Sequence, residues 1–400
     1  MNYTKLLKEN NINTPCFLID TEIIGELSDE ITSALKKYWK NGIVGYSFKT
    51  NNLPWLISFF KEKGFYAEVV SSDEFDLALE MGYPCNKIIF NGPVKDKCTF
   101  EKALKNGSII NIDSKRELMW LKDYDVQLRN EAAVGLRVNF CIEDYCRGES
   151  QCGDEDGRFG FSYERGELKK AIEFLKENQI KLNGLHLHCS SKTRSLNIYK
   201  AIANVAKKII DDYCLNLNYV DIGGGYFGGL PDKPTFDEYF FAVYEILKPY
   251  SNTNLIIEPG MSVVGAGMDY ITSVVDIKQT LNNSFAVLDG SRIHIDPIKR
   301  KKTYSYEIVG RNRSDQAFSE DNAILCGFTC MEDDRFISLK NTKINIGDNI
   351  IFHKVGAYTM GLSAQFIEFY PLVYQISNNE IKIVRKKVTA KDFVELNKEG

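Results

Sequence analysis

The sequence predicts an α/β fold in which a parallel (β/α)8 barrel is followed by a mostly β domain. From residue 14 to residue 258, short apolar runs typical of strands alternate with longer runs whose apolar residues recur at helical spacing. The predicted strands of this part end in small or polar residues, which favours a closed eight-fold barrel over an open sheet. From Val263 onward the runs are strand-like and separated by polar turns, which indicates a second, mostly β domain.

The predicted elements follow one another in a regular order. Residues 14–20 are expected to form a strand and residues 21–38 a helix. Further strands are predicted at 42–48, 66–70, 87–90, 109–112, 132–139, 184–188, 219–222 and 255–257, with helices at 53–63, 72–81, 100–106, 116–121 and 167–178. Ser72 is the predicted cap of helix 72–81. Strands of the second domain are predicted at 270–277, 284–288, 323–326 and 349–353.

The composition fits a globular protein whose partner is a small molecule. A chain of 400 residues that is 44% hydrophobic can bury a large core in roughly two or three domains. The net charge of -4, with no basic block beyond residues 299–302, argues against nucleic acid or an anionic membrane as the main partner.

Two further features predict a cytoplasmic, reducing location. Residues 1–10 contain no apolar signal region, and no uncharged stretch is long enough to span a bilayer. The 10 cysteines are scattered, which fits reduced thiols better than a disulfide framework. Cys141, Cys146 and Cys152 lack CxxC spacing, so we expect incidental loop cysteines there rather than a metal site.

A lysine lies at the end of one predicted strand. The apolar run that begins at Gly42 ends in Lys49 and continues in polar residues as far as Asn52. Side chains at the carboxyl ends of parallel strands line ligand sites, and a partly desolvated lysine there can form a Schiff base. The alternative is a surface lysine that simply follows a core strand, and residues further along the chain decide between the two.

Three other strand ends carry residues that suit one cofactor. The glycine-rich run at 221–229 has bare amides that can hold a phosphate, although glycine clusters also form simple turns. Glu258 can keep a pyridine nitrogen protonated, or it is a solvated loop acid. His186 and His188 share one face of a strand. They are core residues, metal ligands without an obvious third partner, or rings that stack on a flat cofactor. With Lys49, these features together describe pyridoxal phosphate.

The order of short motifs resembles that of a known family. YSFKTN, AEVVS, LRVN with RFGF, HLHCSS, DIGGG, EPG, CGFTC and GAYT occur in the order found in fold-type III, alanine-racemase-like pyridoxal-phosphate decarboxylases, the group of diaminopimelate and ornithine decarboxylases. The resemblance covers nearly the whole chain. It implies a (β/α)8 barrel over residues 24–264, a β-rich domain from residues 1–23 and 265–400 that takes the N-terminal strand, and a homodimer with shared active sites.

Matched position by position, the resemblance assigns roles to particular residues. Lys49 is the Schiff-base lysine, His188 stacks on the cofactor ring, and Glu258 faces the pyridine nitrogen. Further cofactor contacts fall on Glu68, Arg137, Ser191, Gly224, Gly225, Gly260 and Tyr358. Cys330 reaches the site from the partner subunit, where it can protonate the carbanion left after carbon dioxide departs. The substrate contacts fall on Cys330, Asp334, Lys299, Arg300 and Tyr358, and no metal is expected.

Three positions depart from the family pattern. The family's EPGR ends here in Met261, and the acid that commonly follows the active-site cysteine is Met331, although residues 332–334 are acidic. An arginine that precedes a proline in diaminopimelate decarboxylases is replaced by Asp296. We therefore expect a different distal end on the substrate and poor activity on diaminopimelate itself. The expected substrate is an amino acid like diaminopimelate, ornithine or lysine, or a biosynthetic substrate attached to a carrier.

The resulting expectation is pyridoxal-phosphate-dependent decarboxylation of an amino acid to the amine and carbon dioxide. An amino-acid racemase is the nearest alternative, but it needs two bases on opposite faces of the substrate, and the EPG and CGFTC segments favour decarboxylation. A non-catalytic carrier of pyridoxal phosphate is a more distant alternative. The long β domain argues against a carrier, because a carrier has no use for an acid from a second subunit.

Overall fold

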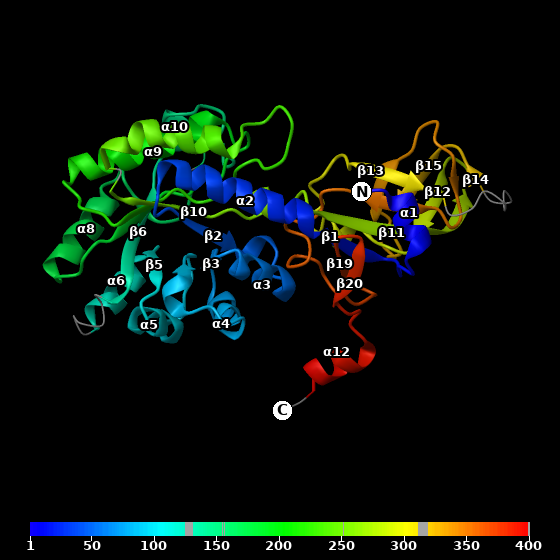
Figure 1. Cartoon of the computed structure of the whole chain (residues 1–400), viewed down its shortest axis with the longest axis horizontal. Coiled ribbons are helices and arrows are strands. Elements are labelled where there is room, and N and C mark those ends of the chain that lie inside the picture. The colour runs from blue at the N-terminus through cyan, green and yellow to red at the C-terminus, as the bar shows by residue number, and fades with distance from the viewer. Residues whose placement is uncertain (125–130, 154, 156, 251, 311–318, 399–400) are drawn as a thin grey trace. The chain divides into compact units, whose positions relative to one another are not determined.

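The structure is a computed structural model, and it describes the chain except for residues 125–130, 154, 156, 251, 311–318 and 399–400. The chain divides into two compact units, both drawn in Figure 1. One unit, here called the barrel unit, is Leu27–Val263; the other, the β unit, combines Met1–Glu26 with Val264–Gly400. The sequence predicts a barrel domain of residues 24–264 and a β-rich domain of residues 1–23 and 265–400. These domain boundaries stay a prediction.

The barrel unit contains a closed ring of parallel strands. In ring order these are β2 (Ile43–Ser47), β3 (Tyr66–Val69), β4 (Ile88–Phe90), β5 (Ile109–Ile112), β6 (Ala133–Asn139), β8 (Gly184–His186), β9 (Tyr219–Asp221) and β10 (Asn254–Ile257). β10 pairs with β2 through Ile256 and Ile43, which closes the ring. A short strand, β7 (Phe161–Ser162), adds to β6 outside it. The predicted (β/α)8 barrel is confirmed.

Helices surround this ring (Figure 1). They are α3 (Pro54–Glu62), α4 (Ser72–Glu80), α5 (Lys97–Lys105), α6 (Lys115–Lys122), α8 (Glu167–Glu177), α9 (Leu196–Asp212) and α10 (Phe236–Leu247), and α2 (Thr21–Tyr38) precedes β2. The predicted cap of α4 is wrong by one residue. Ser71 is extended and its side chain accepts a hydrogen bond from the Glu74 amide, whereas Ser72 is already helical. α9 and α10 lie outside the predicted elements.

One large ring, that of Tyr219, packs between strands inside the barrel. The side chain of Tyr219 occupies the space beside Gly135 and Gly184, where a Cβ atom on either glycine would collide with it. The Tyr219 hydroxyl donates a 2.8 Å hydrogen bond to the side-chain oxygen of Asn111. The apolar body of the ring packs with Ile89, Ile109 and Ile256, so this layer closes the barrel and the residues beyond it face its carboxyl-terminal mouth.

The β unit is built around the long strand β11 (Met268–Gln279). Its partners are β1 (Cys16–Asp20), β12 (Ser284–Leu288) and β18 (Asn349–Phe352), and the sheet continues through β13 (Tyr306–Val309), β15 (Ala323–Cys326), β16 (Arg335–Ser338), β19 (Leu372–Ser377) and β20 (Glu380–Arg385). A bulge between Val274 and Asp276 interrupts the pairing of β11 with β12. β1 lies between β11 and β19, so the expectation that this sheet takes the N-terminal strand is confirmed.

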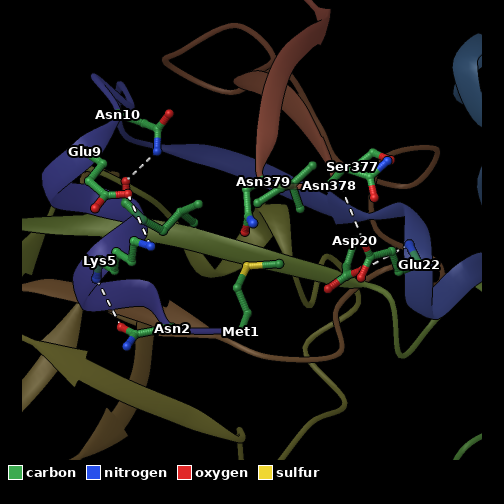
Figure 2. A pocket seen from close by; sticks show the side chains of 12 residues that line it. Met1, Asn2, Lys5, Glu9, Asn10, Asp20, Glu22, Ser377, Asn378 and Asn379 are labelled. Carbon is green, nitrogen blue, oxygen red and sulfur yellow. Dashed lines mark hydrogen bonds and ion pairs between the residues drawn. The ribbon is translucent and has the colours of Figure 1, made fainter.

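Short elements complete the chain. These are the pair β14 (Ser319–Glu320) and β17 (Ile344–Asn345), and the helices α1 (Tyr3–Glu9), α11 (Met261–Val264) and α12 (Ala390–Leu396). Among the helices within the described ranges, none combines the length and the apolar character that crossing a bilayer requires. A pocket of about 280 Å³ in the β unit lies between α1 and the turn after β19 and is lined mainly by polar side chains such as Lys5, Glu9 and Asn379 (Figure 2).

Candidate active site

Lys49 lies directly after β2, in a short 3-10 turn that comprises Phe48–Thr50. Its Nζ atom is 2.9 Å from Oε2 of Glu68, whose side chain is 1% exposed on β3. The same carboxylate oxygen accepts a 2.6 Å hydrogen bond from the hydroxyl of Ser47. The lysine side chain is 38% exposed while its carboxylate partner is buried, so the amine is held at the mouth of the barrel by a buried acid.

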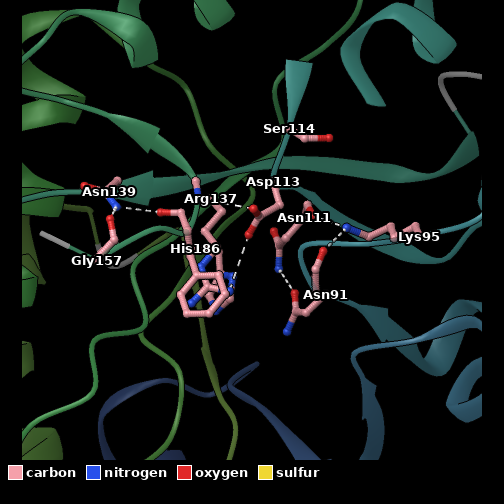
Figure 3. Close-up of polar contacts among 12 residues, drawn as sticks. Asn91, Lys95, Asn111, Asp113, Ser114, Arg137, Asn139, Gly157 and His186 are labelled. Atoms are coloured by element: carbon pink, nitrogen blue, oxygen red, sulfur yellow. Dashed lines mark hydrogen bonds and ion pairs between the residues drawn. The ribbon is translucent and has the colours of Figure 1, made fainter. Parts of the chain in front are cut away.

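A carboxamide connects this ion pair to Glu258. Asn91, which follows β4, donates from its side-chain nitrogen to Oε1 of Glu68 at 3.0 Å and to Oε1 of Glu258 at 2.5 Å. Its own side-chain oxygen accepts from Asn111 at 2.8 Å (Figure 3). Two acids from β3 and from the end of β10 are therefore held in fixed positions relative to Lys49 by one amide, in the part of the barrel that faces its mouth.

Glu258 is 5% exposed and lies beside two groups from other strands. Oε2 of Glu258 is 3.6 Å from Nε2 of His186, whose ring nitrogens have no hydrogen-bond partner among the described residues. Burial by itself raises the pKa of Glu258, but His186, Lys49 and a hydrogen bond with Asp221 outweigh burial, and the net pKa lies below its usual range. The Glu258 side chain is therefore ionised in the folded protein.

His188 lies at the end of β8, two residues after His186, and the two rings are nearly parallel with an angle of 20° between their planes. Nδ1 of His188 accepts a 3.3 Å hydrogen bond from the backbone N–H of Gly224. Desolvation, with repulsion from Arg137 and other nearby charges, lowers the pKa of His188 to about 3. The ring is neutral, and a neutral flat ring at the barrel mouth can lie against a flat cofactor.

The glycine-rich loop after β9 is shaped by two close approaches. Gly223 and Gly225 have φ angles of 69° and 97°, which non-glycine residues rarely adopt. A Cβ atom on Gly224 would collide with the carbonyl oxygen of Glu258, and one on Gly223 would collide with the ring of His188. The backbone thus reaches the mouth without side chains of its own, although the Gly224 amide donates to His188 and the Gly223 amide donates to Asp221. A glycine loop of this kind fits a phosphate group.

The loop after β10 approaches Lys49 in the same way. A Cβ atom on Gly260 would collide with Oγ1 of Thr50, the last residue of the lysine turn. The carbonyl of Pro259 accepts a 3.1 Å hydrogen bond from the amide of Ser47. Gly260 is therefore required for packing the Glu258 loop against the Lys49 turn, whatever contact it makes with a cofactor.

Arg137 lies on β6, and Ser191 lies in the loop that follows β8. The hydroxyl oxygen of Ser191 accepts a 2.9 Å hydrogen bond from the amide of Arg194. The guanidinium of Arg137 is 3.4 Å from Oδ2 of Asp113 and lies over the ring of Phe159, 4.5 Å from its centroid. Figure 3 shows Arg137 reaching Asp113 from the neighbouring strand. This arrangement fixes the arginine but leaves its role toward a ligand a prediction.

The remaining predicted residues, Cys330, Asp334, Lys299, Arg300 and Tyr358, belong to the β unit. Asp334 is 2% exposed, and its carboxylate accepts hydrogen bonds from Ser291, Arg292 and Thr329. It thereby fixes the loop that carries the exposed Cys330. The geometry gives Asp334 a structural task, and its contact with substrate stays a prediction.

The two cationic candidates in the β unit differ. Lys299 forms an ion pair with Asp333, whereas no ion pair of Arg300 is found among the described residues. The backbone N–H of Arg300 donates to Asp296, whose carboxylate also holds Arg292 at 2.8 Å. Asp296, the residue that replaces an expected arginine, is thus a structural acid that shapes this turn.

Several residues of the barrel mouth were not predicted from the sequence. They are Asn91, Asn111, Asp113, Tyr219 and Asp221, and all of them are buried. Asn91 and Asp113 each come directly after a predicted strand, and Lys49 also lies at a strand end. Because polar residues at the carboxyl ends of barrel strands line the site, this position could have identified both. Asn111 and Tyr219 lie within strands, and nothing local distinguishes them from ordinary core residues.

Three comparisons with known proteins agree with this geometry. A family model described as "Pyridoxal-dependent decarboxylase, pyridoxal binding domain" matches residues 25–265. The chain is 26% identical over 395 residues to a diaminopimelate decarboxylase of Zymomonas mobilis, with 95% of this chain and 92% of the relative covered.

Among solved structures, a diaminopimelate decarboxylase from M. jannaschii in co-complex with L-lysine is similar with a TM-score of 0.83 and 21% identity, covering 100% of this chain and 94% of the other. An arginine decarboxylase of Paramecium bursaria Chlorella virus bound to agmatine has a TM-score of 0.78 and 21% identity, covering 94% of this chain and 99% of the other. Both show the same fold.

The fold and the family match over more than half of the chain define its class: the chain belongs to the pyridoxal-dependent decarboxylases. It is a pyridoxal-phosphate-dependent amino-acid decarboxylase. The predicted family and cofactor are confirmed, and the relatives do not favour the racemase alternative.

Proposed function

We propose that the barrel mouth is where this decarboxylase acts, with Lys49 as the attachment point of pyridoxal phosphate and Glu258 as the acid that faces its pyridine nitrogen. The observation that carries the proposal is the link through Asn91, which holds the carboxylates beside Lys49 and at Glu258 in one rigid set. When bound, the cofactor supplies an electron sink for the pair released as carbon dioxide leaves.

The other residues of the mouth bind and orient. His188 covers one ring face, and the amides of Gly224 and Gly225, with Ser191 and Tyr358, hold the phosphate. Glu258 stays ionised and keeps a proton on the pyridine nitrogen, because a buried negative charge there favours the protonated ring. After carbon dioxide departs, Cys330 Sγ or a water gives a proton to the α-carbon. The product is the amine.

For the substrate, we propose an amino acid whose distal end differs from that of diaminopimelate. That compound ends in a second amino acid group, and its carboxylate requires a bidentate cationic clamp of the kind arginine provides. Here Met261 and Asp296 stand where arginines are expected, and the Asp296 carboxylate is occupied by Arg292. The proposed substrate is either a free amino acid or one attached to a carrier. We also propose that the protein is cytoplasmic.

A panel of amino acids tests this choice of substrate. We expect turnover of meso-diaminopimelate to be at least tenfold slower than that of the best substrate, because one missing charged hydrogen bond costs about 1.5 to 3 kcal/mol. Carbon dioxide release and amine products are measured for each compound. Lys299→Ala and Arg300→Ala remove the remaining cationic candidates, and Lys302→Ala serves as a matched control in the same exposed run. Efficient diaminopimelate turnover that survives both losses contradicts the proposal.

We also propose that the working unit is a homodimer in which Cys330 completes the site of the partner subunit. Such an isologous pair has two equal sites. A Lys49→Ala chain still supplies Cys330, and a Cys330→Ala chain still supplies Lys49, so a mixed dimer contains one native site. Random reassortment of equal amounts puts about half of the dimers in the mixed form and restores roughly a quarter of wild-type activity.

The control for this mixing experiment is the double variant Lys49→Ala/Cys330→Ala, mixed with either single variant, which yields no native site. Sedimentation confirms that each sample is a dimer. If the two single variants are dimers and regain no activity together, Cys330 acts within its own subunit or not at all.

A further inference from the structure

A third buried acid lies beside Glu258, and nothing proposed so far uses it. Asp221 is the last residue of β9 and is fully buried. One carboxylate oxygen of Asp221, one of Glu258 and one ring nitrogen of His186 lie within 4.8 Å of one another. With Glu68, three carboxyl groups lie in or directly after three strands at the barrel mouth, and Lys49 pairs with Glu68 and lowers the pKa of Glu258.

The three acids are not equally supplied with hydrogen-bond donors. Glu68 accepts from Ser47, Lys49 and Asn91. Asp221 accepts one good hydrogen bond, from the amide of Gly223 at 2.9 Å, while Asn111 reaches its other oxygen only at 3.5 Å. A buried carboxylate with few donors is the costliest place for a negative charge.

A hydrogen bond also joins Asp221 to Glu258. Two ionised carboxylates have no hydrogen between them, so this contact requires one proton on one of the two acids. Glu258 has Asn91 as a donor and His186 and Lys49 nearby, all of which favour its ionised form. Asp221 lacks comparable support.

We propose that Asp221 carries a proton in the folded enzyme and donates it to Glu258, so that Asp221 is a positioning residue for the acid facing the pyridine nitrogen. The neutral Asp221 leaves the negative charge on Glu258, where the proposed chemistry needs it. The proton adds a second donor to Glu258, beside the Asn91 amide that donates to Oε1. The inference rests on the proposed function only for the role of Glu258, not for the protonation of Asp221.

The other groups around Asp221 do not supply a compensating charge. Burial raises the pKa of Tyr219 and of Tyr226 well above the usual range, so both phenols are neutral. Burial and the negative charge of Glu258 likewise raise the pKa of Asp221. Glu68 adds further repulsion from β3, and His186, from β8, makes no hydrogen bond among the described residues.

Infrared spectroscopy of the full chain tests this proposal, with and without pyridoxal phosphate. A protonated carboxyl group has a carbonyl stretch that ionised carboxylates lack. We measure at about pH 8, where Glu74, whose pKa burial raises to about 7, is mostly ionised. We expect a protonated-carboxyl band in the wild type that is lost in Asp221→Asn and kept in Asp348→Asn, a matched change at another buried aspartate.

Isotope labelling makes the assignment independent of any variant. Labelling the aspartate side-chain carboxyl carbons with carbon-13 shifts the band if the protonated acid is an aspartate and leaves it in place if it is Glu258. Affinity for added pyridoxal phosphate gives a second readout. Asn keeps a neutral donor at position 221, so we expect Asp221→Ala to lose about tenfold more affinity than Asp221→Asn.

The possible results separate clearly. Any of three results overturns the proposal. The band is absent in the wild type, aspartate labelling does not shift it, or it survives in a folded Asp221→Asn. Equal affinity losses for Asn and Ala overturn the positioning role. Because the band belongs to the side chain and is measured without turnover, a failure of the proposed catalytic function leaves this result unaffected.

Discussion

Lys49→Ala is expected to lose at least a thousandfold in kcat/KM, equivalent to about 4 kcal/mol or more of transition-state stabilisation. Lys49 is the amine at the barrel mouth that is held by a buried carboxylate and still partly exposed, so it can both attach the cofactor and release it to a substrate. The purified variant should also lack the visible absorption band of the attached cofactor.

Direct identification does not depend on activity. Borohydride reduction of the wild type should fix the cofactor to one peptide, and mass spectrometry should locate it at Lys49. Lys49→Arg is the matched control, because it keeps a cation beside Glu68 but cannot attach the cofactor; it should retain folding and lose the label. A label on another lysine, or a Lys49→Ala protein with its band and activity intact, shows that the assignment is mistaken.

The parts of this site that could be predicted are those encoded locally. Alternating strand and helix periodicity predicts the barrel, and a polar residue after an apolar run marks a strand end, which is how Lys49 and Glu258 could be singled out. The two positions meet because β2 and β10 are neighbours in the closed ring. Local pattern therefore predicts both the positions and the end of the barrel to which they belong.

The connecting residues could not be predicted because their role exists only after the barrel closes. Asn91 and Glu258 are 167 positions apart, and Tyr219 and Asn111 are 108 apart. Asparagine after a strand is equally typical of a turn, so the residue type alone carries no signal of a bridge between two acids. The protonated state proposed for Asp221 is even harder to predict from the sequence, since it depends on which hydrogen-bond donors surround each acid in the folded protein.

The cap of α4 shows the same limit at short range. Both serines can cap a helix, but Ser71 is followed three residues later by Glu74, the spacing of a capping box, whereas Ser72 is followed at that spacing by Phe75. The choice is made by the path of the chain after β3, where Val70 donates its amide to the side chain of Glu74 and Ser71 remains extended. Where two cap formers are adjacent, the start of the helix is uncertain by one residue unless the acid three residues later is also considered.

Replacing Glu258 should lower kcat by about tenfold to a thousandfold, which corresponds to about 1.4 to 4 kcal/mol of added barrier. The physical reason is charge. Glu258 is buried, ionised and fixed by Asn91, so it favours a proton on the pyridine nitrogen and strengthens the electron sink. Glu258→Gln keeps the shape and loses the charge, whereas Glu258→Ala also removes the carboxylate oxygen to which Asn91 donates.

Two measurements separate the effect on catalysis from the effect on cofactor binding. One is single-turnover release of carbon dioxide, and the other is titration of the cofactor-free protein with pyridoxal phosphate. We expect kcat to fall in both variants and cofactor affinity to fall less than kcat, with the larger affinity loss in Glu258→Ala. Glu74→Gln is the control, because Glu74 is also largely buried but accepts its hydrogen bond from the backbone of Val70. Turnover that is unchanged in Glu258→Gln and in Glu258→Ala would remove this acid from the mechanism, while the protonation of Asp221 would still be decided by the infrared band.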